Sequence, residues 1–205
     1  MDTVIALTAS RSPGQLVSVG LDSGERFLLS TRRLAELRLA AGDELDSRRV
    51  RELREAAEDE RNEQRVLRLI AVRPRSRTEL AHRLAEWQVR EPRAQALLER
   101  LESAGLLDER QLAADVSEGL RRRGHGSLRA AHDLDRLAVD PATAAPVVGD
   151  HAATDAARAR ALLVSRFGHG PYAAAAARRA AALLARRGFG AEVVSEVLGL
   201  DDHLL

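Results

Sequence analysis

The chain repeats a set of apolar positions at intervals of fifty residues. Leu184, Phe189, Val194, Val197 and Leu198 are apolar, and so are the residues fifty and one hundred positions before them. Those earlier residues are Leu134, Val139, Ala144, Val147 and Val148, then Leu84, Val89, Ala94, Leu97 and Leu98. Such agreement is not expected by chance in a chain that is 45% hydrophobic. A repeat of this length indicates stacked helical units that bury a shared core.

Helix signals divide each repeat into about three helices. Ser76 and Glu79 have the spacing of a capping box, Pro92 suits the first turn of the next helix, and Gly105 suits a helix end. We therefore predict three-helix repeats at 61–107, 108–149 and 150–205. In the second repeat the stretch PATAAPVVG contains Pro146, so we expect its third helix to be short, interrupted and loosely formed.

A different pattern precedes the repeats. Residues 3–9, 15–21 and 25–29 are rich in strand-forming residues, and the turn sequences SPG and DSGE separate them. Candidate helices follow at 31–39 and 47–60, and we interpret the charged segment that ends this unit as a solvated helix or linker. The predicted fold is mostly α: tandem three-helix repeats in an elongated, curved array, preceded by a small β-hairpin or sheet plus helix unit at 1–60.

Composition excludes several classes of protein. There is no cysteine, which excludes disulfides and thiolate metal sites and fits a reducing compartment. No run of about 18 apolar residues predicts a membrane span, and the first ten residues lack the features of a signal peptide. We therefore expect a cytoplasmic protein.

The arginines are unevenly distributed. The net charge is only +1, and all 32 basic residues are arginine. Residues 64–78 hold five arginines and residues 156–191 hold seven, in both cases without an acid. Acid-free basic stretches favour contact with phosphates. The candidate contact residues are Arg73, Arg75, Arg77, Arg121, Arg122, Arg123, Arg178, Arg179, Arg186 and Arg187.

Each candidate also has a purely structural interpretation. Arg121, Arg122 and Arg123 end a predicted helix, where arginines also offset the helix dipole. Arg178, Arg179, Arg186 and Arg187 share roughly one face of the last long helix, which favours contact. Trp87 could stack on a base, but its spacing from Leu80 and Leu84 favours core packing.

No catalytic or cofactor motif is present. The six histidines lack metal-ligand spacing, and neither Gly-His-Gly sequence precedes the lysine of a phosphate-binding loop. We predict a protein without enzymatic activity, metal or cofactor.

An ordered series of motifs runs along residues 62–200. It begins with a Ser-led helix, continues with a helix pair that contains a Gly-Leu-Leu-Asp turn and with a Gly-x-Gly turn, and ends with an Arg-Gly-Phe helix end. The residues that carry it are Ser76, Glu79, Leu80, Leu84, Leu97, Leu98, Leu101, Gly105, Leu107, Asp108, Gly124, Gly126, Arg187, Gly188, Phe189, Val194 and Leu198. This series resembles the RecX family of regulators of the RecA recombinase.

The resemblance implies a negative regulator that acts in DNA repair by homologous recombination and in the SOS response. Such a protein binds the RecA filament on single-stranded DNA and restrains filament growth, strand exchange and ATP hydrolysis. The ten arginines would then contact the filament or its nucleic acid, with double-stranded DNA as a further candidate, and we expect a monomer that needs no membrane. The alternative is a tandem helix-turn-helix-like DNA-binding protein, transcriptional or nucleoid. Alanine-rich helices offer few side chains that read base edges, which favours the regulator.

Overall fold

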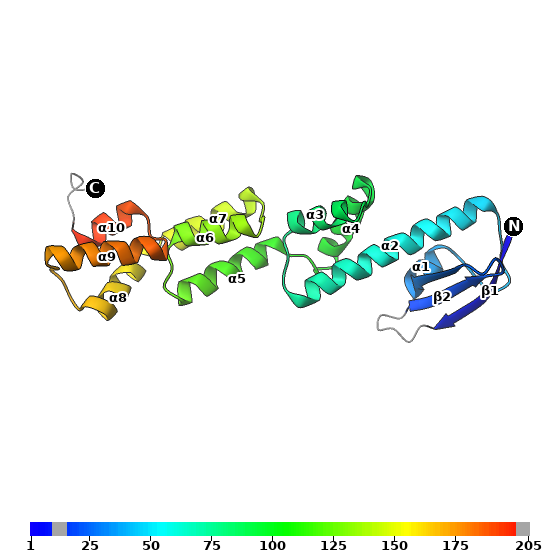
Figure 1. The fold of residues 1–205 in the computed structure, drawn as a ribbon, viewed down its shortest axis with the longest axis horizontal. Helices are drawn as coiled ribbons and strands as arrows, with labels where there is room; N and C mark the ends of the chain where they lie inside the picture. The colour runs from blue at the N-terminus through cyan, green and yellow to red at the C-terminus, as the bar shows by residue number, and fades with distance from the viewer. Residues whose placement is uncertain (10–15, 200–205) are drawn as a thin grey trace. The chain divides into compact units, whose positions relative to one another are not determined.

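A computed structural model of the 205-residue chain describes residues 1–9 and 16–199. The protein is 65% helical, with ten helices and four strands among the described residues. It divides into two compact units, Met1–Arg73 (unit 1) and Pro74–Leu205 (unit 2). This confirms the mostly helical fold with a small N-terminal sheet (Figure 1).

The sheet of unit 1 is antiparallel and has the strand order β3-β2-β1-β4. Its strands are β1 (Asp2–Ala9), β2 (Leu16–Leu21), β3 (Arg26–Ser30) and β4 (Glu44–Leu45). The first three match the sequence prediction. The fourth was not predicted, because two residues carry no periodicity and are fixed only by pairing with Asp2 and Thr3. The expected SPG turn lies outside the described residues, whereas Gly24 adopts a φ of 87° in the DSGE turn.

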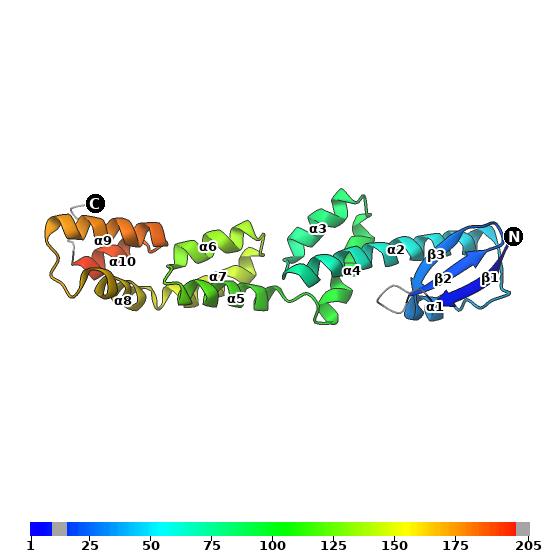
Figure 2. The same cartoon turned by 60° about the horizontal axis from the view of Figure 1, so that its bottom comes forward.

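Two helices cover one face of this sheet (Figure 2). They are α1 (Thr31–Glu36) and α2 (Ser47–Val72), which begin at the capping side chains of Ser30 and Asp46. Helix α2 continues through residue 60, where the sequence placed the end of the unit, because no glycine or proline interrupts it before Pro74. The N-terminal unit therefore extends to Arg73.

The charged segment of α2 is part of the fold of unit 1, rather than only the solvated linker that we expected. Glu60 is 2% exposed and accepts hydrogen bonds from the backbone N–H and the hydroxyl of Ser30, at 3.1 and 2.7 Å. Arg33 donates from Nη2 to Glu63 at 3.1 Å. Although burial raises the pKa of Glu60, the hydrogen bonds from Ser30 and Gln64 bring it below its ordinary value. The alternating charges conceal this contact, since exposed and buried ion pairs give the same sequence pattern.

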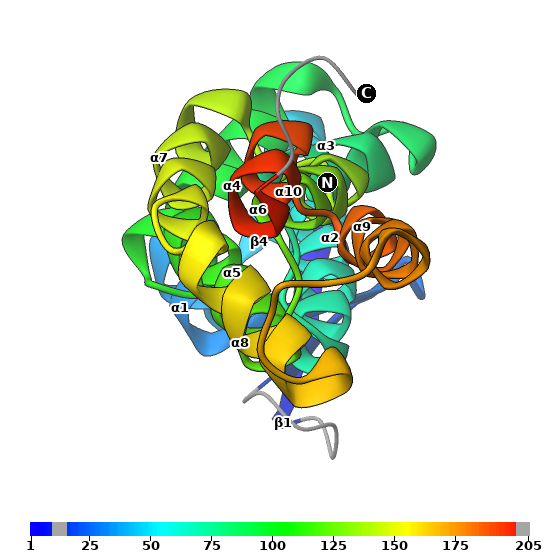
Figure 3. The same cartoon turned by 90° about the vertical axis from the view of Figure 1, so that its left-hand side faces the viewer.

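As far as the structure describes it, unit 2 has eight helices in three successive groups (Figure 1). Figure 3 shows the third group, α8 to α10, from its end. The first group is α3 (Arg77–Glu86) and α4 (Glu91–Ser103). The second group is α5 (Glu109–Arg122), α6 (Ser127–Arg136) and α7 (Pro141–Ala152). The third group is α8 (Asp155–Phe167), α9 (Ala174–Arg187) and α10 (Ala191–Leu198). The second and third groups each enclose a hydrophobic core.

The fifty-residue register is present in the structure. Leu84, Leu134 and Leu184 are each 0% exposed. The next helix end also repeats, because the backbone N–H five residues after each leucine donates to the carbonyl of that leucine. These bonds are Val89 to Leu84 at 3.0 Å, Val139 to Leu134 at 3.1 Å and Phe189 to Leu184 at 3.1 Å. The residues just before the donors, Gln88, Ala138 and Gly188, have φ values of 60°, 53° and 83°, as expected for a Schellman-type helix end.

One expectation for unit 2 was wrong. Helix α7 is continuous over twelve residues although Pro146 lies inside it. It persists because Ala144, Val147 and Val148 pack against the core of the second group, which offsets the one backbone hydrogen bond that proline removes. Trp87 is the C-cap residue of α3 and is half-buried.

Candidate nucleic-acid interface

Two of the predicted arginine clusters meet where the second and third helix groups of unit 2 join. Helix α5 ends in Arg121, Arg122 and the cap residue Arg123, and α9 ends in Arg186 and Arg187. The turn after each helix is glycine-rich, Gly124-His125-Gly126 in one case and Gly188-Phe189-Gly190 in the other. We call the contact between these two turns the second junction.

Main-chain hydrogen bonds hold the second junction together. The N–H of Gly126 donates to the carbonyl of Arg187 at 2.9 Å, and the N–H of Leu128 donates to the carbonyl of Gly188 at 3.0 Å. The guanidinium of Arg187 donates from Nη1 to the carbonyl of Arg123 at 2.7 Å. Arg187 thus caps the C-terminal end of α5 and brings the ends of two basic helices together.

Glycine is required on both sides of this contact. A Cβ atom on Gly126 would lie 2.3 Å from the carbonyl oxygen of Gly188, and one on Gly188 would lie 2.6 Å from the backbone nitrogen of Arg129. Gly188 also has a φ of 83°, which L side chains rarely adopt. The two glycines therefore permit a direct contact between the backbones of neighbouring groups.

The first and second groups meet in an equivalent contact, which we call the first junction. The hydroxyl of Ser76 donates to the carbonyl of Leu137 at 2.6 Å. Glu109 accepts from the N–H of Arg77 at 3.0 Å and from the N–H of Asp140 at 3.3 Å. In the second junction the N–H of Ser127 donates to Asp155 at 3.0 Å. Since Glu109 and Asp155 each begin the first helix of their group, the same acidic contact recurs.

A buried histidine supports the second junction. His151 is 0% exposed, and its Nδ1 lies 2.9 Å from the hydroxyl of Ser117. Its Nε2 lies 3.0 Å from the carbonyl of His125, which can only accept, so Nε2 carries the proton and Nδ1 accepts from Ser117. Burial lowers the pKa of His151, and the positive charges of Arg158 and Arg121 lower it further. The imidazole is therefore neutral at physiological pH.

Several of the clustered arginines remain open to solvent. Arg122, Arg123, Arg178, Arg179 and Arg186 are exposed. The side chain of Arg122 is 72% exposed, and Glu118, which lies 4.0 Å from it on α5, is itself exposed. One α-helical residue rises about 1.5 Å, so Arg178 lies about 12 Å from Arg186 along α9. Arg178, Arg179 and Arg186 thus make the exposed surface of α9 basic, and Arg122 and Arg123 do the same at the C-terminal end of α5.

The remaining candidates are bonded within the chain or lie elsewhere. Arg75 pairs with Glu79, and Arg77 donates to Glu102 and Gln95 at 2.6 and 2.5 Å. Arg121 is half-buried. Arg73 is exposed at the end of unit 1. The sequence reveals the acid-free stretches but not these pairings, because the acids that pair with them lie outside the basic stretches.

Sequence reasoning missed the acids and the histidine that join the groups. Nothing in the sequence singles out Glu109, Asp155 or His151 from their neighbours, since each acts across a junction. Gly126 and Gly188 had a visible signal, because a Gly-x-Gly turn occurs at both places.

The described residues contain no group of three or more histidine or acidic side chains that could hold a metal ion. Among the helices of residues 1–9 and 16–199, none is both long and apolar enough to cross a membrane.

The fold and the arginine clusters together define a tandem helical-repeat protein that carries a basic surface on its last repeats.

Comparison with known proteins identifies the family. No family model matches the chain. Regulatory protein RecX of Halorhodospira halophila is 36% identical over 138 residues, which cover 67% of this chain and 86% of the relative. Regulatory protein RecX of Leptothrix cholodnii is 33% identical over 137 residues, which cover 67% of this chain and 87% of the relative. The chain therefore belongs to the RecX family of regulatory proteins.

Solved structures show the same fold. A crystal structure of regulatory protein RecX superposes with a TM-score of 0.71 and 20% identity, covering 97% of this chain and 99% of that one. RecX from Lactobacillus salivarius superposes with a TM-score of 0.58 and 15% identity, covering 70% of this chain and 96% of that one. The similarity in fold to the first of these structures thus extends over 97% of the chain.

Proposed function

We propose that this protein is a cytoplasmic, non-enzymatic negative regulator of the RecA recombinase. It binds the RecA filament on single-stranded DNA as a monomer and restrains filament growth, strand exchange and ATP hydrolysis, and so acts in recombinational repair and the SOS response. Membership of the RecX family supports this proposal. The observation that best supports this mode of binding is the second junction, because two helix groups present exposed arginines together there.

Neutralisation of phosphates by arginines favours binding to nucleic acid. A nucleic-acid backbone releases bound counterions when arginines neutralise its phosphates, and this release favours binding. Arg122, Arg123 and Arg186 are exposed at the junction, and Arg178 and Arg179 extend the basic surface along α9. Arg75 and Arg77 are satisfied by acids and a glutamine within the chain, so we assign them a smaller part in the contact than the sequence suggested.

Inhibition of the DNA-dependent ATP hydrolysis of RecA tests the proposal. We expect substoichiometric amounts of the wild-type chain to inhibit hydrolysis. The triple variant Arg122→Glu, Arg123→Glu, Arg186→Glu should weaken inhibition by about tenfold or more, since charge reversal at several contacts removes the phosphate attraction. The matched control is Arg38→Glu, Arg51→Glu, Arg61→Glu, which makes the same charge change at exposed positions of unit 1 and should inhibit like the wild type.

The alternative DNA-binding function predicts a different pair of results. A sequence-specific repressor would prefer one duplex sequence over random DNA by about a thousandfold or more. It would also leave ATP hydrolysis unchanged at concentrations too low to coat the DNA. Those two results together would reject the regulator proposal.

A further inference from the structure

The sheet of unit 1 has one face that no helix of the unit covers. Rows of paired residues alternate between the two faces, as the pleat of a sheet requires. The row Leu7–Val19–Phe27 packs into the core beside Val50 and Leu53 of α2. The opposite face carries the cross-strand rows Ala6–Gly20–Arg26 and Thr8–Ser18–Leu28.

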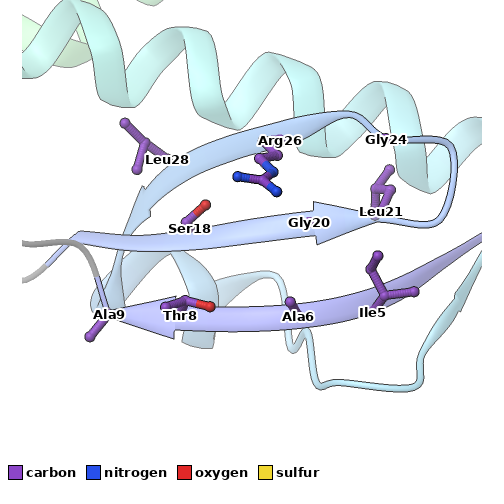
Figure 4. Close-up of a pocket in the computed structure, with 10 residues that line it drawn as sticks. All are labelled: Ile5, Ala6, Thr8, Ala9, Ser18, Gly20, Leu21, Gly24, Arg26 and Leu28. Atoms are coloured by element: carbon purple, nitrogen blue, oxygen red, sulfur yellow. The ribbon is translucent and has the colours of Figure 1, made fainter.

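This open face is hollowed into a groove (Figure 4). Short side chains form its floor, because Ser18 and Gly20 occupy the centres of the two rows and Ala6 and Thr8 their β1 ends. Longer side chains flank it, and they are Ile5, Arg26 and Leu28. The groove has a volume of about 460 Å³. Ile5 is 63% exposed and Leu28 is 48% exposed, so two branched apolar side chains face solvent beside it.

Among the described residues that line the groove, Arg26 is the single charged one. Arg26 is exposed and forms no ion pair with the described part of the chain. The described strand residues 3–9 and 16–21 include no charged residue. An occupant that matches this surface therefore offers apolar side chains together with one carboxylate.

These features exclude other occupants. A second copy would bring another Arg26 without an acid to pair with it, because the lining residues that the structure describes include no acid. Single-stranded nucleic acid binds sheets through exposed aromatic rings, whereas the one aromatic of these strands, Phe27, packs against the core. A peptide strand added to the sheet would pair at one of its edges, β3 or β4, and would leave uncovered Ser18 and Gly20 of the inner strand β2, which form the floor of the groove.

We propose that the groove binds an amphipathic helix of a partner protein that carries an acidic residue beside its apolar stripe. From strand spacings of about 4.8 Å and rises of about 3.3 Å per residue, Ile5 and Leu28 lie about 14 Å apart across the face. Two apolar residues separated by two to three turns of a helix span that distance, at about 5.4 Å per turn. A helix also satisfies its own backbone hydrogen bonds, which an extended peptide on a sheet face does not. The carboxylate pairs with Arg26.

Selection from a library of phage-displayed helical peptides on the full-length chain tests this proposal. The probe is the selected peptide, made synthetically, with its affinity and its effects on backbone amide NMR signals measured. We expect peptides with two apolar residues two to three turns apart and an intervening Glu or Asp, and shifts centred on Thr8, Ser18 and Gly20. Arg26→Glu should weaken binding by about tenfold, as loss of an interfacial charge pair does. Arg51→Glu, an exposed reversal on α2, should leave it unchanged.

Substitution of the flanking residues gives an independent check. Leu28→Asp should abolish binding and keep the native circular dichroism, since half of this side chain is already exposed. If Leu28→Asp unfolds the chain, two other measurements replace it: the affinity of the peptide for Arg26→Glu, and the affinity of a peptide with Gln in place of Glu for the wild type. Both affinities should be lower than that of the original pair. The proposal is overturned if selection yields no peptide, if selected peptides are basic, or if they bind Arg26→Glu as tightly as the wild type. If oligo-dT competes with the peptide for this face, the face is a nucleic-acid site and the proposal is wrong. If the chain self-associates and Leu28→Asp abolishes the self-association, the face is a contact between copies and the proposal is also wrong.

Discussion

The two junctions of unit 2 join equivalent parts of the repeat by different chemistry. In the first junction the hydroxyl of Ser76 reaches the carbonyl of Leu137. In the second, the position of Ser76 is taken by Gly126, whose backbone N–H bonds directly to the carbonyl of Arg187. Fifty residues before Gly188, the first junction has Ala138. A side chain makes the first contact and the backbone makes the second.

This difference shows how a repeat protein places a binding surface in one part of an otherwise regular array. A serine hydroxyl extends the reach of the chain and leaves room for the Cβ of Ala138. In the second junction both positions are glycine, and the backbones lie so close that neither position has space for a Cβ atom. The guanidinium of Arg187 then reaches the carbonyl of Arg123 at 2.7 Å. The closer approach is what brings the basic ends of α5 and α9 together.

The strongest test of this difference between the junctions is a substitution that adds a methyl group at Gly188. Gly188→Ala should lower the free energy of unfolding by about 3 kcal/mol or more, because it combines a left-handed backbone with a backbone clash. Urea denaturation measures this. Gly190→Ala is the matched control, since Gly190 lies in the same turn with a φ of −67° and no atom within 4 Å of an added Cβ.

Ser76→Ala at the first junction should lower the free energy of unfolding by less, about 1–2 kcal/mol, through loss of the helix cap and of the bond to Leu137.

For the second junction, equal stability of the Gly188→Ala and Gly190→Ala proteins would contradict the packing described there.

Acid should weaken the second junction more than the first. The pKa of His151 is lowered in the folded chain, mainly by burial, whereas an unfolded histidine has an ordinary value of 6.5. The unfolded state therefore takes up the proton first, and the contribution of His151 is lost as pH falls from 6.5 toward the folded pKa. We expect His151→Gln to reduce the loss of thermal stability between pH values of about 7 and 5.5.

The hydrogen-bonding residues of the first junction include no histidine. His132→Gln changes an exposed histidine and serves as the control. If it flattens the pH dependence as much as His151→Gln does, the effect does not come from the buried imidazole.

The smallest expected effect is a gain in stability. Ala138 has a φ of 53°, a conformation that glycine adopts at lower cost. Ala138→Gly should raise the free energy of unfolding by about 0.5–1 kcal/mol. Ala145→Gly, at an exposed position inside α7, should lower it by about 1 kcal/mol, as glycine does in a helix interior. A loss of stability in Ala138→Gly would show that its methyl group packs in the first junction.

The sequence predicts best what repeats or what acts locally. Leu84, Leu134 and Leu184 are identified by their spacing, and Ser76 is identified as a cap by its distance from Glu79. Contacts between groups are not predicted, because Glu109 and Asp155 act on residues 28 to 32 positions away. The arginine clusters are visible as charge, but only the structure separates Arg77, which is bonded to Glu102, from the exposed Arg122.

Glu109 has a consequence for how unit 2 unfolds. Its carboxylate lies in the first turn of α5 and accepts from the N–H of Arg77 at the start of α3 and from the N–H of Asp140 just before α7. From the beginning of α5, one side chain thus bonds to the beginnings of two other helices, α3 in the first group and α7 in the second. In a one-dimensional array of repeats, such shared contacts raise the free-energy cost of a boundary between a folded and an unfolded repeat. The first two groups should consequently melt in one cooperative transition and not as separate domains.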